Sequence, residues 1–365
     1  MAKIIVGMSG GVDSAVTAYL LKQAGHEVIG VTLRTWIAAD GQESRCCEID
    51  DARRAAWELG IQYYVVNCIR EFEQEVTEPF VQEYIRGRTP NPCVGCNRSI
   101  KWEYMLRFAK TMNADLVATG HYASVLRLEN GRYTVKKARH AEKDQTYMLY
   151  KLTQEQLAST IMPLGELSKE EVRRIAEFTG LAVAKKPDSQ ELCFITKGKY
   201  SDYVEEHAQE PVPGEGDFVD EEGNILGRHK GIIHYTPGQR KGLNLAMGHP
   251  VYVKKVDVVN NEVVVCEEPS LYAEELVCSE MNYLGISGLG PGEALNADVK
   301  IRYHHQAREA EVRALDHSRV KVHFSRPVRA PAPGQSAVLY DEGGCVLGGG
   351  IISEVIFAEK EKAGT

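Results

Sequence analysis

The sequence lacks a long hydrophobic run. Nowhere among its 365 residues do about 20 apolar residues follow one another, as a membrane-spanning helix requires. The chain passes from Lys3 directly into the apolar run Ile4–Val6, without the regions of a cleavable leader. It also lacks internal repeats and low-complexity tracts. These absences exclude a helical membrane span, and we expect a cytoplasmic protein.

An excess of positive charge is missing too. The 43 lysines and arginines are outnumbered by 51 aspartates and glutamates, which gives a net charge of -8. This balance excludes a nucleic-acid binder that is basic over its whole surface, although local basic patches can still bind phosphate.

Cysteine is too sparse for a disulfide scaffold, with nine residues in a chain of this size. We therefore expect reduced thiols that serve in the core, in metal binding or in catalysis. Four lie on apolar, strand-like segments and are predicted to be core residues: Cys68, Cys266, Cys278 and Cys345. The adjacent pair Cys46-Cys47 is read as packed or incidental, with zinc ligation as its alternative.

A phosphate-binding turn follows the first apolar run. Ser9-Gly-Gly-Val-Asp-Ser14 has paired glycines that allow successive N–H groups to face one anion, at the start of a predicted helix. The lysine of the common P-loop is absent, and Asp13 stands before the final serine. A carboxylate beside phosphates implies Mg²⁺. The pattern resembles the PP-loop of ATP pyrophosphatases, which cleave ATP between the α and β phosphates.

Short β-branched runs alternate with helical patterns up to about Thr119, which predicts an α/β domain with a parallel sheet. Ligands of such sheets gather at the carboxyl ends of the strands. We therefore expect three loops to meet there: 9–14, 33–34 and 119–122. Residues 153–178 are predicted to be helical, with capping boxes at Thr153 to Gln156 and Ser168 to Glu171.

Three domains are predicted, because the residue composition and the hydrophobic pattern change after this point. Prolines and glycines from Pro211 mark a boundary, and short strands at barrel-like spacing fill the C-terminal part. The expected fold class is α/β: a Rossmann-like PP-loop domain with a helical extension over 1–210, a central β-rich domain over 211–278, and a C-terminal β-barrel over 279–365.

Two thiols three positions apart follow a proline-stiffened basic loop. Cys93-Val-Gly-Cys96 comes directly after 86–92, in which Arg86 and Arg88 make the surroundings electropositive and so lower thiol pKa values. A third thiol, Cys193, follows two lysines. A single CxxC pattern is compatible with redox, zinc or iron–sulfur roles.

Over nearly its whole length the chain resembles the tRNA-specific 2-thiouridylases. The marks of that family occur in order: Gly7-Met-Ser-Gly-Gly-Val-Asp-Ser14, Gly87-Arg-Thr-Pro-Asn-Pro92, Cys96-Asn97, Ala118-Thr-Gly-His-Tyr122, Lys143-Asp-Gln145, Asp188-Ser189, Cys193-Phe194, Gly238-Gln-Arg-Lys-Gly242 and Pro333-Gly-Gln-Ser336. The resemblance implies ATP-dependent 2-thiolation of the wobble uridine (position 34) of tRNA by a sulfurtransferase, with Mg²⁺ as a cofactor.

The resemblance also implies roles for individual residues. Cys96 would be the nucleophile and Cys193 the thiol that carries a persulfide, with Cys93 and Asp13 completing the catalytic set. ATP would be bound by Gly7, Met8, Ser9, Gly10, Gly11, Val12, Asp13, Ser14, Leu33 and Gly120. The tRNA and its target base would be contacted by Asn91, Pro92, Cys93, His121, Lys143, Asp144, Gln145, Arg302, Tyr303 and Gln335.

Cys93 departs from the commonly met family pattern, which has aspartate there. The exchange removes a carboxylate and creates a three-thiol set, Cys93, Cys96 and Cys193, that could hold three irons of a [4Fe–4S] cluster. Two sulfur chemistries stay open: a persulfide resolved to a disulfide, and sulfide carried on a cluster. A structural zinc site, with Cys46 or Cys47 as a fourth ligand, is the alternative to both.

Partners follow from the same resemblance. They are tRNAs for lysine, glutamate and glutamine, and a sulfur donor such as a cysteine desulfurase or a relay protein. Two rival functions remain. A PP-loop amide ligase would share the loop without needing the thiols, and a nucleotide- or RNA-binding module would hold ATP without cleaving it.

Overall fold

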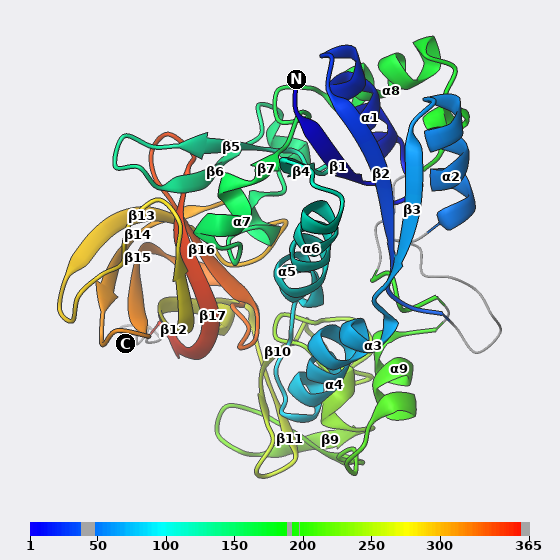
Figure 1. Ribbon diagram of the computed structural model, residues 1–365. Coiled ribbons are helices and arrows are strands. Elements are labelled where there is room, and N and C mark those ends of the chain that lie inside the picture. The colour runs from blue at the N-terminus through cyan, green and yellow to red at the C-terminus, as the bar shows by residue number, and fades with distance from the viewer. Residues whose placement is uncertain (38–47, 188–191, 197, 359–365) are drawn as a thin grey trace.

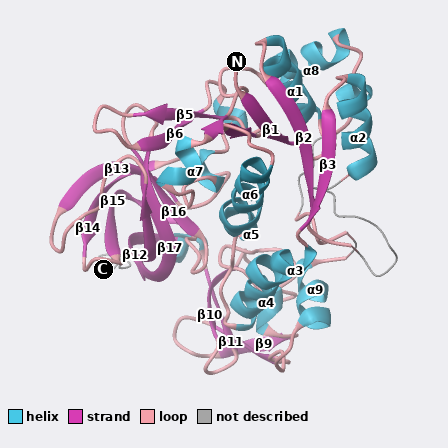
Figure 2. Ribbon diagram, viewed as in Figure 1, coloured by secondary structure: helices cyan, strands magenta, loops and turns pink. Residues whose placement is uncertain are grey.

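The computed structural model describes residues 1–37, 48–187, 192–196 and 198–358. Figure 1 shows a parallel sheet flanked by helices at the N-terminal end, a barrel of strands beside it, and a smaller sheet with short helices beneath. In Figure 2 helices surround the parallel sheet, whereas the barrel consists of strands and loops. The α/β class with a central β-rich part and a C-terminal barrel is confirmed.

The parallel sheet has the order β3-β2-β1-β4-β7, and every neighbouring pair is parallel. The central strand β1 is buried on both faces, since Ile4, Ile5 and Val6 are fully buried. This explains its continuous apolar run. The strands are β1 (Lys3–Gly7), β2 (Glu27–Arg34), β3 (Gln62–Asn67), β4 (Leu116–Ala118) and β7 (Thr160–Ile161).

Helices pack on both faces of this sheet and continue into the extension. They are α1 (Val12–Gln23), α2 (Ile49–Glu58), α3 (Ile69–Phe72), α4 (Glu78–Ile85), α5 (Pro92–Cys96), α6 (Glu103–Thr111), α7 (Gln154–Ala158), α8 (Lys169–Phe178) and α9 (Tyr200–His207). A hairpin of β5 (Ala123–Arg127) and β6 (Tyr133–Lys137) leaves the sheet toward the barrel.

Both predicted capping boxes are present. Thr153 and Gln156 cap α7 reciprocally, and Ser168 and Glu171 do the same for α8. The expectation of purely helical structure over 153–178 is wrong at β7. This two-residue strand is too short for a periodic signal, and it forms because it extends the sheet beside β4.

The central sheet has the order β10-β11-β8-β9 and mixes parallel and antiparallel pairs. Its strands are β8 (Gly216–Val219), β9 (Ile225–His229), β10 (Tyr252–Asp257) and β11 (Glu262–Cys266). Phe218, Val253 and Val263 are fully buried beneath it.

The barrel is closed in the order β12-β15-β14-β13-β16-β17, which leaves no free sheet edge. Alternate residues such as Val312, Val322 and Leu339 fill its interior. The strands are β12 (Tyr272–Tyr283), β13 (Ala294–Lys300), β14 (Arg308–Ala314), β15 (Val320–Arg329), β16 (Ser336–Tyr340) and β17 (Val346–Phe357). The limits predicted for the three domains stay predictions.

The basic loop 86–92 touches both neighbouring parts of the molecule. The Thr89 amide donates to the Pro333 carbonyl at 2.8 Å, and the Gln335 side-chain amide donates back to the Thr89 carbonyl at 2.8 Å. Gly87 lies against Val258 of the central part. The loop that precedes the two thiols is therefore fixed by contacts from the barrel and the central sheet.

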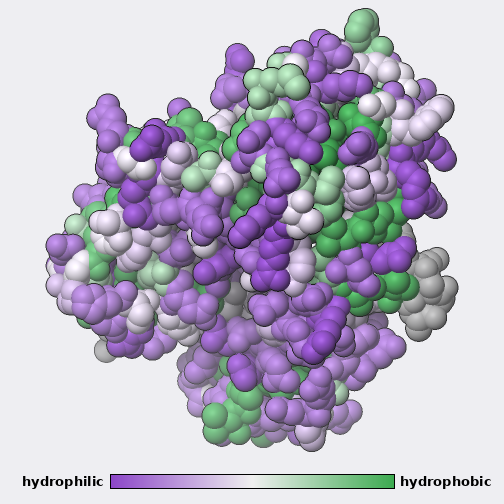
Figure 3. Space-filling model, viewed as in Figure 1, coloured by the Kyte–Doolittle hydropathy of each residue, from purple (hydrophilic) through white to green (hydrophobic). Residues whose placement is uncertain are grey.

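Hydrophilic residues cover most of the face seen in Figure 3, while hydrophobic residues gather along the edge strand β3, where Tyr64 and Val65 are exposed. None of the helices in the described ranges has the length and apolar character needed to cross a membrane.

The four cysteines predicted for the core, Cys68, Cys266, Cys278 and Cys345, are buried, which confirms that prediction.

Candidate active site

The PP-loop connects β1 to α1 at the carboxyl end of the sheet. Gly10 has φ of +81°, and a Cβ there would lie 2.6 Å from the Glu48 carbonyl oxygen. Only glycine fits this position without strain. The N-terminus of α1 carries no side-chain cap on its cap residue, Gly11. Its amide end therefore faces the loop, as an anion site requires.

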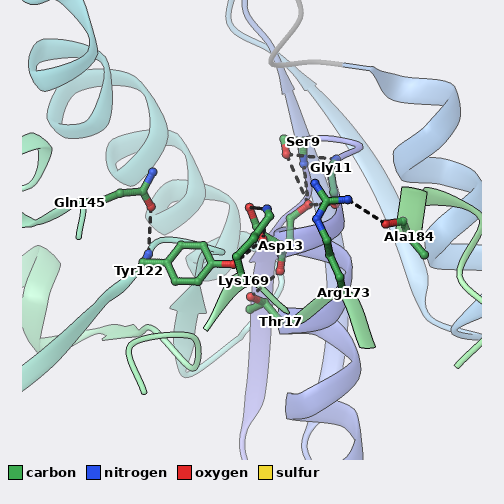
Figure 4. Close-up of polar contacts among 10 residues, drawn as sticks. Ser9, Gly11, Asp13, Thr17, Tyr122, Gln145, Lys169, Arg173 and Ala184 are labelled. Carbon is green, nitrogen blue, oxygen red and sulfur yellow. Dashed lines mark hydrogen bonds and ion pairs between the residues drawn. The ribbon is translucent and has the colours of Figure 1, made fainter. Parts of the chain in front are cut away.

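Two serines hold the loop in shape. The Ser9 amide donates to Ser14 Oγ at 3.2 Å, and Ser14 Oγ donates to the Gly11 carbonyl at 3.1 Å. The Gly11 amide lies 3.4 Å from Ser9 Oγ (Figure 4). The hydroxyls therefore order the loop before any ligand binds.

Two elements, the loop 119–122 and helix α8, converge on the Asp13 carboxylate of α1 (Figure 4). The Tyr122 hydroxyl donates to Oδ1 at 2.8 Å, and the Lys169 ammonium reaches Oδ1 and Oδ2 at 2.7 and 2.8 Å. The Lys169 side chain is only 8% exposed, so this ion pair is largely shielded from water. Lys169 thus brings to the loop the positive charge that the missing P-loop lysine would supply.

Sequence reasoning missed Lys169, although a signal exists. It occupies the first turn of α8, where the helix dipole disfavours a cation. A lysine at such a position points to an anionic partner outside its own helix. Its sequence distance from Asp13 gives no hint of which one.

The loop 119–122 packs directly on the PP-loop. A Cβ on Gly120 would lie 2.8 Å from the Asp13 backbone carbon, so glycine permits this close approach. Strand β2 joins from the other side, since the Met8 amide donates to the Val31 carbonyl and Thr32 Oγ1 donates to the Met8 carbonyl. The predicted meeting of the loops 9–14 and 119–122 is confirmed. Strand β2 contacts Met8, just before the PP-loop, and the meeting of 33–34 with these loops stays a prediction.

Lys186 forms a second ion-pair group beside the PP-loop. Its ammonium contacts the carboxylates of Asp51 and Glu48 and donates to the Gly10 carbonyl at 3.2 Å. Burial opposes the charge, but the two carboxylates outweigh it and raise the pKa of Lys186. The chain at Lys186 is thereby anchored at the nucleotide loop.

Cys93 and Cys96 lie on the single-turn helix α5. The Asn91 side chain caps this helix by accepting the Cys93 amide at 3.2 Å, and Pro92 takes its first position. Cys96 is buried and Cys93 is half-buried. A π-helical segment, Asn97–Trp102, follows immediately, and such segments often occur at functional sites.

Asn97 carries an orphaned acceptor beside Cys96. Its side-chain nitrogen donates to the Met148 carbonyl at 2.9 Å, whereas Oδ1 is buried without a hydrogen-bond partner. A buried acceptor of this kind is costly and marks a place where a ligand donor can bind.

Cys193 packs on the same hydrophobic cluster that contains Cys96. The ring of its neighbour Phe194 lies edge-on to Phe72 and Phe80, with centroids 5.9 and 5.2 Å away. The Phe194 ring thus holds the chain next to Cys193 against α3 and α4. Among the described residues, no three Cys, His, Asp or Glu side chains come together as a metal site would need. Cys46, Cys47, Asp188 and Ser189 lie outside the described residues.

His121 is held in its neutral form. Burial, together with the nearby Lys101 charge, lowers its pKa to about 3. Its ring packs against Trp102 with centroids 5.5 Å apart, and Nδ1 lies 2.9 Å from Thr119 Oγ1. A neutral imidazole here can donate or accept a hydrogen bond without carrying charge.

Two of the residues predicted to bind tRNA have structural partners. The buried Asp144 carboxylate accepts from Thr146 Oγ1 at 2.8 Å, and Oδ1 also accepts the Ala138 amide at 3.2 Å. Gln145 exchanges hydrogen bonds with the Tyr122 backbone. Lys143 lies on the 3₁₀ turn just before them.

On the barrel side, Arg302 lies between two parts of the molecule. Its Nη2 donates to the carbonyls of Pro237 and Ala330 at 2.9 and 2.6 Å, and Nε is buried without a partner. Tyr303 is half-buried. The nearby charges of Asp144 and the Cys93 thiol contribute to its raised pKa, after burial itself. The Tyr303 ring lies 6.3 Å from that of Tyr147, so it joins the barrel side to the N-terminal domain.

Three family models match the chain in succession. The tRNA methyl transferase HUP domain matches residues 2–197, the tRNA methyl transferase PRC-barrel domain matches 201–267, and the aminomethyltransferase beta-barrel domain matches 273–352. Together they account for the parallel sheet, the central sheet and the barrel.

Curated relatives match over nearly the full length. The tRNA-specific 2-thiouridylase MnmA of Lachnoclostridium phytofermentans is 48% identical over 360 residues, covering 96% of this chain and 99% of the relative. That of Acetivibrio thermocellus is 48% identical with the same coverage, and that of Clostridioides difficile is 45% identical, covering 96% and 98%.

Solved structures are more distant. The U34-tRNA thiolase NcsA from Methanococcus maripaludis with its [4Fe-4S] cluster is 22% identical, covers 56% of this chain and 63% of that chain, and has a TM-score of 0.35. A 4-thiouridine synthetase in complex with RNA and ATP is 18% identical, covers 56% and 50%, and has a TM-score of 0.36.

Proposed function

Because the chain belongs to the family of tRNA-specific 2-thiouridylases, we propose that it is an ATP-dependent tRNA sulfurtransferase that replaces the C2 oxygen of the wobble uridine with sulfur. One observation carries the proposal beyond family membership. A PP-loop completed by Lys169 and Tyr122 occurs in the same domain, residues 2–197, as the free thiols Cys96 and Cys193.

The first step is activation of a poor leaving group. The uridine C2 oxygen attacks the α phosphorus of ATP, the bond to the bridging oxygen breaks, and pyrophosphate leaves. The loop amides and the Lys169 ammonium face the charge that develops on the departing phosphates. The Asp13 carboxylate would hold Mg²⁺ together with phosphate oxygens, and its oxygens would then share the metal with the contacts from Lys169 and Tyr122. Bound Mg²⁺ supplies further charge neutralisation.

The second step is sulfur transfer. The terminal sulfur of a Cys193 persulfide attacks C2, and AMP departs with the former C2 oxygen. The Cys96 thiolate then attacks the Cys193 sulfur, which forms a Cys96–Cys193 disulfide and releases the thiolated base. A thiol reductant must reopen the disulfide after each turnover.

A [4Fe–4S] cluster on Cys93, Cys96 and Cys193 is the alternative route for sulfur. Within the described residues, no three Cys, His, Asp or Glu side chains are assembled as metal ligands. Iron and sulfide analysis of the anaerobically purified protein tests this choice. If the protein contains stoichiometric iron and thiolation requires it, the cluster route is correct and the persulfide route is wrong.

The substrate and partners follow from the same proposal. The expected acceptors are the tRNAs for lysine, glutamate and glutamine, and the sulfur donor is a cysteine desulfurase or a relay protein. The target base enters from an anticodon loop whose bases are accessible without opening a duplex. Because its substrate is tRNA, we infer a cytoplasmic location.

The stoichiometry of ATP cleavage tests the proposed function. The protein is mixed with wobble-uridine tRNA, ATP and a persulfide donor, and AMP, pyrophosphate and thiolated tRNA are counted. We expect one of each per turnover, and no thiolated tRNA with Cys96→Ala. A Cys96→Ala protein that retains full turnover would favour the amide ligase. Binding of ATP without pyrophosphate release would favour the nucleotide-binding module.

A further inference from the structure

The end of β13 carries a lysine that the proposed function does not use. Val299 and Ile301 point into the barrel core, so Lys300 between them points outward, toward Tyr147 of the N-terminal domain. Its ammonium lies 5.5 Å from the centre of the Tyr303 ring and 6.0 Å from that of Tyr147. Both distances are within the range of a cation–π contact.

Lys300 is a half-buried cation, and no carboxylate of the described residues forms a direct ion pair with it. Within the described residues, its ammonium forms neither a hydrogen bond nor an ion pair in the structure, and burial lowers its pKa. The nearby Asp144 carboxylate favours the charge, but its oxygens already accept hydrogen bonds from Thr146 and Ala138. Removing a cation from water without a partner is costly. The arrangement therefore suits an anion that arrives with a ligand.

A second lysine, Lys137, adds positive charge near Lys300. The Lys137 ammonium lies 4.1 Å from the centre of the Tyr340 ring, and its charge further lowers the pKa of Lys300. Tyr340 contacts Thr146, which binds Asp144. Through Tyr340 and Thr146, Lys137 thus adjoins the same buried carboxylate that lies near Lys300.

Arg302, by contrast, is held inside the protein by the carbonyls of Pro237 and Ala330. We propose that Lys300, supported by Lys137, binds a backbone phosphate of the substrate RNA beside the target base, and that Arg302 fixes the barrel against the central sheet. This inference rests on the proposed function, since it takes tRNA as the ligand.

Salt dependence of RNA binding tests the proposal. The probe is an anticodon stem-loop RNA with an unmodified wobble uridine, and its dissociation constant is measured against salt concentration for wild type, Lys300→Gln and Lys300→Arg. Loss of one phosphate contact lowers the slope of the log–log plot by about 0.7 to 0.9. We expect that change and about tenfold weaker binding for Lys300→Gln, with most of the slope restored in Lys300→Arg.

The matched control is Lys321→Gln. Lys321 lies in the same barrel but is already paired with Glu275 at 2.8 Å, so its removal should leave the slope unchanged. Thermal unfolding of each variant verifies folding. An unchanged slope in a folded Lys300→Gln protein, or an equal change in Lys321→Gln, would overturn the proposal.

A phosphate scan gives a second readout that does not depend on catalysis. Single methylphosphonates are placed along the stem-loop, and each neutralises one phosphate. One position should weaken binding to wild type but have no effect on Lys300→Gln. If every position acts equally on both proteins, Lys300 does not bind phosphate. If wild type does not bind the RNA at all, the proposed function fails instead.

Discussion

The Lys169 ammonium bridges both oxygens of the Asp13 carboxylate, at 2.7 and 2.8 Å, although 156 positions separate the two residues in sequence. The pair joins the first turn of α8 to the first turn of α1. It therefore places a buried positive charge at the nucleotide loop, and it ties two distant helices together there.

Replacing Lys169 with methionine should abolish most of the ATP chemistry. The variant keeps the aliphatic bulk but leaves the Asp13 carboxylate without its cation, so developing phosphate charge is no longer neutralised. We expect tRNA-dependent AMP formation to fall about a hundredfold, with partial recovery in Lys169→Arg. The measurement is the initial rate of pyrophosphate release. An unchanged rate in Lys169→Met would show that the ion pair is only structural.

Adding a methyl group at Gly120 should displace the PP-loop. In Gly120→Ala the new Cβ would lie 2.8 Å from the Asp13 backbone carbon, and a misplacement of about 1 Å can reduce the rate by about a hundredfold. ATP binding by calorimetry should weaken by about tenfold or more. Gly214→Ala is the control, since a Cβ there would meet no atom within 4 Å. Equal affinity in both variants would contradict the packing argument.

Variants of Cys193 and Cys96 should block the reaction at different steps. Cys193→Ser cannot carry the persulfide, whereas Cys96→Ser can still accept sulfur on Cys193 but cannot release the product. Single-turnover reactions analysed under non-reducing conditions should show a tRNA–protein adduct for Cys96→Ser and none for Cys193→Ser. An adduct in Cys193→Ser would instead indicate that Cys96 carries the persulfide and that Cys193 releases the product.

His121 should make stability depend on pH. Its pKa falls from 6.5 when unfolded to about 3 when folded, so the unfolded chain binds the extra proton between these values. Stability attributable to this histidine is present above pH 6.5 and is lost as the pH falls toward 3. The free energy of unfolding, measured with urea, should therefore decrease less between pH 6.5 and 3 for His121→Asn than for wild type. Parallel pH curves would contradict this burial.

Much of the fold was predictable from local patterns. The apolar run of β1 and the two capping boxes act within a few residues, so the sequence displays them directly. The two-residue strand β7 was missed because its pairing with β4 is a tertiary effect. Domain limits and the roles of individual site residues stay predictions.

The site was predictable only in part, for the same reason. Paired glycines in a loop and closely spaced thiols are motifs that can be recognised in the sequence. The roles of Lys169, Lys186 and Lys300 depend on contacts with other residues in the folded protein, which the sequence does not display. Arg302 shows the converse. Its position in a motif predicts an RNA contact, while its hydrogen bonds to Pro237 and Ala330 emerge only when the domains pack.

The most direct test of sulfur transfer to the wobble base is mass spectrometry of nucleosides. Unmodified tRNA is incubated with the protein, ATP and a persulfide donor labelled with a heavy sulfur isotope, then digested. The account predicts labelled 2-thiouridine from the wobble position with wild type and none without ATP. Uridine that stays unlabelled while ATP is cleaved, or label that appears without ATP, would contradict it.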